Sequence, residues 1–219
     1  MNKKPRLIVF ASGSKVGGGS GFEHLVENAR AGVLRADIVA VVSNYEFGGV
    51  RQKADGLKVP FVYFPESWDE QGYKKIIRNY EADFVALSGW LKMVRGLDST
   101  KTFNIHPAFL PRFGGKGMYG IHVHEAVIEA FKKGEITQTA VSMHFVTEKY
   151  DEGPVFFEFP IIVRKDDTPE TLQKRVLEYE HGWQSFITDL VVNGEISWDG
   201  KNRKSLKVPL GYRFLPANL

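Results

Sequence analysis

Asn104 and His106 have the side-chain types and the spacing that acyl transfer requires, and Pro107 follows them directly. In an extended strand, residues two positions apart point to the same side, so both side chains could serve one pocket. A carboxamide can donate an N–H group to an oxyanion, and an imidazole can accept and return a proton. The pair therefore predicts acyl-transfer chemistry in general, with Asn104 as the oxyanion donor and His106 as the acid and base.

Asp151, in the segment Tyr150-Asp151-Glu152-Gly153-Pro154, is a candidate third member of this site. An acid beside Gly-Pro is most often a turn residue, and that interpretation stays open. If the carboxylate instead faces His106, it would raise the pKa of the imidazole and orient the ring.

A glycine-rich segment, Ser12–Gly21, follows an apolar run and precedes a helical pattern. Backbone N–H groups at a helix N-terminus hold phosphate well, and glycine lets the phosphate come close. The segment lacks the Gly-Lys-Ser/Thr ending of a Walker A motif, and Ser43-Asn44 stands where a ribose-binding acid would close the second strand. The segment predicts anion binding, with a flexible loop that only uses glycine for its turns as the alternative.

The first half of the chain alternates apolar strands with helices, which is typical of a parallel sheet wrapped by helices. Ligands of such sheets bind beyond the carboxyl ends of the strands, where the glycine-rich segment, Gly89–Val94 and Asn104 all fall. The predicted strands are Arg6–Ala11, Ile38–Val42, Val59–Phe64 and Phe84–Ser88, and the predicted helices are Phe22–Val33, Phe47–Leu57 and Trp68–Tyr80.

The second half predicts a helix over Val123–Phe131, two antiparallel strands, and a long helix that Thr168 would cap. The strands are Thr139–Val146 and Val155–Val163, the long helix is Pro169–Leu190, and the tail after Asn193 is polar and loop-like. The fold class is therefore α/β: a Rossmann-like, mostly parallel twisted sheet flanked by helices, with an antiparallel C-terminal strand pair. We expect one domain over residues 1–219, divided into a phosphate-binding half (1–100) and a catalytic half (101–219).

Composition limits the classes of function. The 219 residues are 43% hydrophobic and 13% aromatic, which is ample for a full core. A formal charge of +3 without a dense basic run favours a small anionic metabolite over nucleic acid. The chain has no cysteine, which excludes disulfides and thiolate sites, and no apolar run long enough for a membrane span or a signal peptide. We expect a soluble cytoplasmic monomer or homodimer that binds small molecules.

The motifs resemble those of the phosphoribosylglycinamide formyltransferases, within the folate-dependent formyltransferase family. An Asn-x-His-Pro…Leu-Pro signature with a later Asp-x-Gly-Pro is highly specific to folate-dependent formyl transfer and less specific to the acceptor. The resemblance covers nearly the whole chain, through the glycine-rich segment, Leu87–Val94, Asn104–Pro111, His122–His124, Ser142–Thr147, Tyr150–Val155 and Glu180-His181.

This resemblance implies the formyltransferase fold and a metal-free transfer of a formyl group from 10-formyltetrahydrofolate to the amine of phosphoribosylglycinamide. Asn104, His106 and Asp151 would be catalytic, with Asp151 raising the pKa of His106. The phosphate would bind Gly19, Ser20 and Gly21, Glu180 would hold the ribose hydroxyls, and His122 is a possible accessory residue, as is His124. The folate would contact Asn104 and Asp151 together with Leu91, Lys92, Met93, Val94, Thr147, Glu148, Lys149 and Tyr150. Without the resemblance, Glu180 would be a solvated helix residue and either histidine a packing residue.

Several positions depart from the family pattern. Lys15–Gly18 lengthens the glycine-rich segment, and Gly21 stands where asparagine is usual, so phosphate binding would rest on the backbone or on Lys15. Glu70 or Gln71 replaces a usual folate-contacting arginine. The segment Gly114–Gly120 lengthens the turn after Arg112 and could shape the mouth of the site, and Leu177 replaces an often polar substrate-binding residue.

Three alternatives compete with this interpretation. A formyltetrahydrofolate deformylase would carry an added N-terminal domain, whereas the first strand begins at Arg6. A methionyl-tRNA formyltransferase would carry a C-terminal domain and an arginine-rich loop, whereas Phe113-Gly-Gly follows Arg112. A nucleotide-binding module without chemistry would leave Asn104, His106 and Asp151 without a role.

Overall fold

Seven strands form one sheet in the order β3-β2-β1-β4-β5-β6-β7, in a computed structural model that describes residues 3–216. Neighbours from β3 to β5 run parallel, whereas β5 pairs antiparallel with β6, and β6 with β7. This topology confirms the predicted fold class. The strands are β1 (Arg6–Phe10), β2 (Asp37–Ser43), β3 (Phe61–Tyr63), β4 (Phe84–Leu87), β5 (Thr102–His106), β6 (Gln138–Phe145) and β7 (Val155–Ile162).

The helices lie where the apolar spacing predicts them, and the predicted cap of the longest one is present: the Thr168 side chain accepts from the backbone N–H of Thr171. None of the helices within residues 3–216 is long and apolar enough to cross a membrane. The helices are α1 (Ser20–Arg30), α2 (Gly49–Leu57), α3 (Glu70–Asn79), α4 (Ile121–Lys132), α5 (Pro169–Val192) and a short 3₁₀ turn, η1 (Arg203–Ser205).

Strand β3 and helices α2 and α3 begin two residues later than predicted, and for β3 and α3 the reason is local. Strand β3 begins at Phe61 because Pro60 has no N–H to give to a strand ladder. Helix α3 begins at Glu70 because Asp69 is its N-cap, accepting from the backbone N–H of Gly72 at 2.8 Å.

The side chains of β1 alternate between two hydrophobic layers. Leu7 and Val9 face a layer covered by α1, α2, α4 and α5, whereas Ile8 and Phe10 face a second layer covered by α3. Both layers are buried, which explains why the strands are continuously apolar in sequence.

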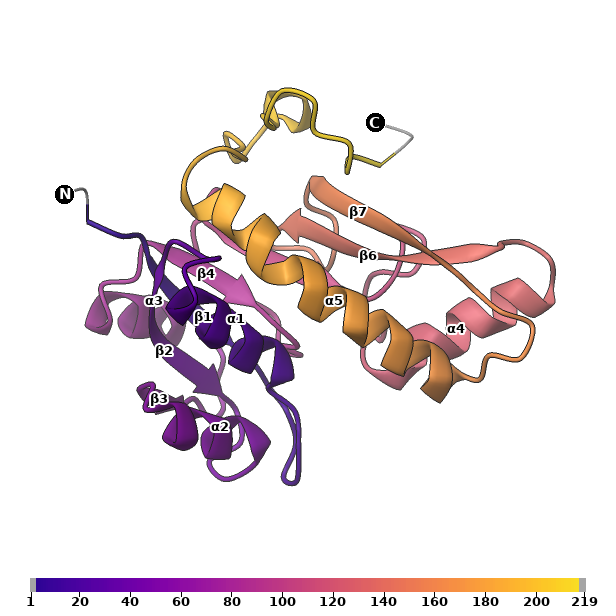
Figure 1. Cartoon of the computed structure of the whole chain (residues 1–219). Helices are drawn as coiled ribbons and strands as arrows, with labels where there is room; N and C mark the ends of the chain where they lie inside the picture. The colour runs from indigo at the N-terminus through magenta and orange to yellow at the C-terminus, as the bar shows by residue number, and fades with distance from the viewer. Residues whose placement is uncertain (1–2, 217–219) are drawn as a thin grey trace.

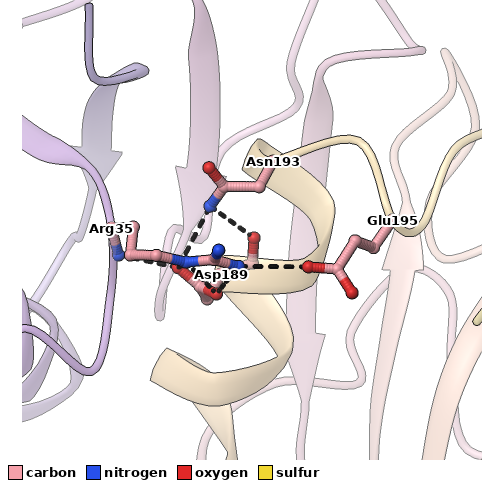
Figure 2. A network of polar contacts seen from close by, with 4 residues as sticks. All are labelled: Arg35, Asp189, Asn193 and Glu195. Carbon is pink, nitrogen blue, oxygen red and sulfur yellow. Dashed lines mark hydrogen bonds and ion pairs between the residues drawn. The ribbon is translucent and has the colours of Figure 1, made fainter. Parts of the chain in front are cut away.

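Helix α5 crosses the molecule and contacts both halves of the chain. It runs in front of the sheet in Figure 1, with α1 on one side and α4 on the other. Its C-terminal end is tied to the segment before β2 by the cluster in Figure 2, where buried Asp189 accepts from the backbone N–H of Arg35 at 2.7 Å and from its guanidinium at 2.6 Å. Asn193 donates to the same carboxylate at 3.0 Å, and Glu195 lies 3.1 Å from Arg35 Nη2.

The tail after Asn193 is loop-like, as predicted, but it is anchored rather than simply polar. Ile196 and Trp198 are buried in the first hydrophobic layer. Glu158 on β7 donates its backbone N–H to the carbonyl of Phe214 at 2.7 Å, so the tail lies along the last strand.

Candidate functional site

A cleft of about 660 Å³ opens at the carboxyl edge of the sheet. It lies between the start of α1, the ends of β4 and β5, the turn at residues 115–120 and one side of α5. Residues predicted for catalysis, phosphate, ribose and folate all contribute to its wall: Gly19, Ser20, Gly21, Leu91, Asn104, His106, Tyr150, Asp151 and Glu180.

Asn104 stands directly opposite His144 in the β5–β6 ladder, and its Nδ2 lies 3.2 Å from His144 Nε2. His144 Nδ1 lies 2.8 Å from the carbonyl oxygen of Phe145. A carbonyl only accepts, so Nδ1 carries a proton, and in this tautomer Nε2 accepts from Asn104. The amide nitrogen of Asn104 has a second N–H, which remains available to the cleft.

Asp151 contacts His144 rather than His106. Its Oδ1 lies 3.3 Å from His144 Nε2, and its Oδ2 accepts from the backbone N–H of Gly115 at 2.9 Å. Within residues 3–216 no hydrogen bond joins it to His106. Burial raises the pKa of Asp151, but the neighbouring rings of His144 and His106 and the hydrogen bond from the Gly115 N–H together outweigh burial, so the pKa is lowered. The backbone is left-handed here (φ 53°), a conformation that aspartate tolerates better than most residues.

His106 is buried, and its Nε2 donates to the carbonyl oxygen of Phe113 at 2.8 Å. Burial lowers the pKa of His106, and this outweighs the upward effects of the Asp151 charge and the Phe113 hydrogen bond. The predicted upward effect of Asp151 is therefore present, but the net direction is the opposite one. The ring is neutral at pH 7, with Nδ1 as its proton-accepting nitrogen.

The histidine that lines the cleft from α4 is His124, not His122. His124 is buried, with no hydrogen-bond partner for Nδ1 among the described residues, and burial together with His106 lowers its pKa to about 4. His122 is exposed and its Nδ1 lies 3.0 Å from Glu125 Oε2, outside the cleft wall.

Residues 14–17 of the lengthened glycine-rich segment form a turn of their own beside α2. Ser14 donates its N–H to the carbonyl of Gly17 at 2.8 Å, and this turn packs against the first residues of α2 at Gly49. The N-cap residue of helix α1 is Gly19, which has no side chain to accept from the first backbone N–H groups of the helix. Gly19, Ser20 and Gly21 line the cleft, and the first backbone N–H groups of a helix, which its own turns leave without partners, favour an anion there.

Glu180 and His181, on α5, lie beside this N-terminal end of α1. Glu180 is half-buried in the cleft wall, and desolvation raises its pKa to about 7. His181 Nε2 lies 3.0 Å from Ser20 Oγ, and its ring lies 4.0 Å from that of His24. Leu177 also lines the cleft, with an apolar side chain, as the sequence indicates.

Seven of the ten residues predicted for folate line one of two hollows. Leu91, Asn104, Tyr150 and Asp151 line the main cleft. A neighbouring hollow of about 320 Å³ contains Val94, Thr147 and Glu148 in its wall.

Three predicted folate residues line neither hollow: Lys92, Met93 and Lys149. The ammonium of Lys92 lies 4.1 Å from the Trp68 ring centre, and the Met93 carbonyl accepts from Tyr73. The side chain of Glu70 pairs with Lys74 and lies against Gly96, away from the cleft.

The sequence-based prediction missed His144 as a site residue, although it lies within a segment used for the family resemblance. Its signal was available: His144 and Ser142 are polar positions two apart on a buried strand, and antiparallel pairing sets them opposite Asn104 and His106. Ser88 and Gln184 also line the cleft and were missed, because their neighbours in sequence are ordinary core and helix residues.

Within residues 3–216, no group of three or more His, Cys, Asp or Glu side chains is arranged to hold a metal ion. The cleft instead combines a neutral buried imidazole, an oriented carboxamide and an ionised carboxylate with an anion-favouring helix end. These groups can stabilise negative charge on a carbonyl oxygen and transfer a proton beside it.

Comparisons with known proteins agree with this chemistry. Residues 5–188 match a family model described as formyl transferase. The chain is 35% identical over 208 residues to the phosphoribosylglycinamide formyltransferase, chloroplastic, of Arabidopsis thaliana, covering 90% of this chain and 68% of that protein. It is 29% identical over 188 residues to the phosphoribosylglycinamide formyltransferase of Bacillus subtilis, covering 81% and 90% respectively.

A solved structure shows the same fold. Glycinamide ribonucleotide transformylase 1 from Symbiobacterium toebii superposes with a TM-score of 0.80 at 23% identity, covering 94% of each chain. The chain spans about two thirds of the length of the plant relatives that it matches.

Proposed function

This chain belongs to the formyl transferase family, and from that premise we propose that it transfers a formyl group from 10-formyltetrahydrofolate to the amine of 5-phosphoribosylglycinamide, a step of purine synthesis. The names of the relatives, phosphoribosylglycinamide formyltransferase in both Arabidopsis thaliana and Bacillus subtilis, support this acceptor over water or a transfer RNA. The single observation that carries the chemistry is the convergence of Asn104, His106 and Asp151 on one cleft with an open helix N-terminus.

The reaction needs a bond from the substrate amine nitrogen to the formyl carbon, with negative charge developing on the formyl oxygen. We assign the free N–H of Asn104 Nδ2 to that oxygen. His144 accepts the other N–H, so the carboxamide is held in one orientation before the substrate arrives. Preorganised donors of this kind reduce the barrier because they need no rearrangement as charge develops.

A proton must leave the attacking amine, and a proton must reach the folate nitrogen as its bond to the formyl carbon breaks. His106 is suited to both transfers because Nε2 donates to Phe113, whereas Nδ1 has no hydrogen-bond partner within residues 3–216. The cationic ring formed between the two transfers is stabilised by the charge of Asp151. Asp151 thus acts on His106 through space, while its direct partner is His144.

The substrate would lie with its phosphate on the backbone N–H groups of Gly19, Ser20 and Gly21 and with its ribose at Glu180. The cleft wall supports this orientation because the α1 end favours an anion and Glu180 lies on the facing helix. The folate would lie at Leu91 and Tyr150 and extend into the neighbouring hollow lined by Thr147 and Glu148. Lys92, Met93 and Lys149 would then contact it only through loop rearrangement or through backbone atoms.

Turnover with and without the acceptor tests the proposal. The purified protein with 10-formyltetrahydrofolate should release tetrahydrofolate only when 5-phosphoribosylglycinamide is added. Release in water alone would favour the deformylase alternative, and formylation of initiator methionyl-tRNA would favour that enzyme class. Binding of nucleotides without any turnover would leave a binding module.

Two further features stay predictions. The cytoplasmic location expected from sequence is untested, and the Arabidopsis thaliana relative is named as chloroplastic. We also expect a monomer or a homodimer, which sedimentation at several protein concentrations would distinguish.

A further inference from the structure

Gly21, in the first turn of α1, has no side chain, and the space that a side chain would fill is occupied by atoms of two other residues. A Cβ atom added at Gly21 would overlap Ser88 Oγ and would lie 2.9 Å from Gln184 Oε1. Ser88 follows the end of β4, and Gln184 projects from α5. Polar groups from two distant segments therefore fill the place that a side chain at residue 21 would take, next to the α1 N-terminus.

Gln184 is buried, and of its amide only the oxygen has a hydrogen-bond partner among the described residues. The residue is 2% exposed, and its Oε1 accepts from Ser88 Oγ at 3.4 Å. Among the described residues none accepts a hydrogen bond from Nε2, yet Nε2 is not one of the enclosed unpaired atoms, and the residue lines the cleft. The NH₂ group is therefore open to the cleft, and a buried amide in this position is suited to donate to an acceptor that binds there.

The surroundings favour an anionic acceptor. The neighbouring donors are the first backbone N–H groups of α1, which Gly19 leaves without a side-chain cap. The helix dipole adds partial positive charge at the same end. Backbone and amide donors together describe a site for an oxygen-rich anion.

We propose that Gln184 donates a hydrogen bond to the phosphate monoester of the substrate, and that Ser88 holds its carboxamide in position through the space that Gly21 leaves open. The proposal deepens the proposed function and rests on it for the identity of the substrate. It adds a side-chain donor to the backbone donors expected from sequence, whereas Lys15 lies exposed on the turn at residues 14–17.

Binding of ribose 5-phosphate, with ribose as the phosphate-free partner, tests the contact independently of turnover. Gln184→Met keeps the side-chain length and removes the donors, and Gln184→Glu keeps the shape and opposes the phosphate charge. Gln138→Met, on the exposed start of β6, is the matched control for losing an amide. Circular dichroism and thermal melting establish that each variant is folded.

The Met variant should bind ribose 5-phosphate about tenfold to a hundredfold more weakly than the unaltered chain, which is the scale of a hydrogen bond to a charged group. The Glu variant should bind it more weakly still, and the control should match the unaltered chain. Wild-type affinity in the Met variant would overturn the proposal, as would an equal loss of affinity for ribose. If the variants bind ribose 5-phosphate more weakly but the unaltered chain does not transfer a formyl group, only the proposed function is wrong. If the chain transfers the formyl group but the variants bind ribose 5-phosphate normally, only this inference is wrong.

Discussion

At the scale of single residues, the site depends on the two N–H groups of the Asn104 amide, which have different roles. One N–H of its amide is held by His144, and the other has no acceptor among the residues that the structure describes. His144 in turn is fixed through its Nδ1–H to the Phe145 carbonyl. The donor direction is therefore set by the β5–β6 pairing and not by the substrate.

Replacing Asn104 by Ala should reduce kcat by about 10²–10³, because one oxyanion donor contributes roughly 2.7–4 kcal/mol to the transition state. Substrate affinity should change little, since the charge on the oxygen develops only during reaction. Steady-state kinetics with a binding titration would measure both, with Gln138→Ala as the control. A loss that appears in KM alone would contradict the oxyanion role.

His106 should titrate below its ordinary pKa of about 6.5, because burial outweighs the charge of Asp151. Its ring is thus neutral at pH 7 and becomes cationic only as the pH falls below that value. Asp151→Asn removes the charge that raises the pKa, so the titration should move to still lower pH. NMR of ring-labelled histidine would measure the shift, and movement to higher pH in the variant would contradict the through-space coupling.

At the scale of elements, the site depends on how closely the segment before β7 packs on β6. A Cβ at Gly153 would overlap the carbonyl oxygen of Phe145, and Asp151 lies two residues earlier in a left-handed conformation. Close backbone approach at Gly153 thus places the Asp151 carboxylate beside His144.

Gly153→Ala should destabilise the protein by about 1–3 kcal/mol, the usual range for overpacking. It should also move Asp151 and weaken catalysis. Gly182→Ala is the matched control, because no atom lies within 4 Å of its added Cβ and it is inside α5. This control should gain about 0.5–1 kcal/mol, because Gly is unfavourable within a helix. Chemical denaturation would measure both, and equal stability of the two variants would contradict the packing argument.

At the scale of the whole molecule, the sheet and α5 join the two halves of the chain. Strands β4 and β5 pair across the boundary near residue 100, and α5 packs on both α1 and α4. The cleft takes its walls from both halves, so neither half holds the site alone.

The chain should unfold in one transition, because this continuous sheet leaves no plane along which the halves could separate. Trp90 reports on the first half and Trp198 on the second, and both are buried. Variants retaining a single one of these tryptophans, with Phe at the other positions, should show coincident fluorescence transitions in urea. Two separate midpoints would show two domains instead of the single domain expected from sequence.

The sequence alone determined the fold class and most of the element positions, because apolar periodicity reflects which faces each element buries. It also predicted that Asn104 and His106 share one side of a strand, because residues two apart in a strand point the same way, whereas Asp151 stayed open as a turn residue until the family resemblance was considered. The family signature supplied the chemistry, since it lies in short contiguous motifs.

Only the tertiary structure decided which group each side chain contacts. It showed that Asp151 contacts His144 and that His124, not His122, lines the cleft. It also showed that burial lowers the pKa of His106 below its ordinary value. It also placed Gln184 beside Gly21 across more than half of the chain. Such contacts depend on strand register, burial and distances between segments far apart in sequence, which local patterns of residues do not encode.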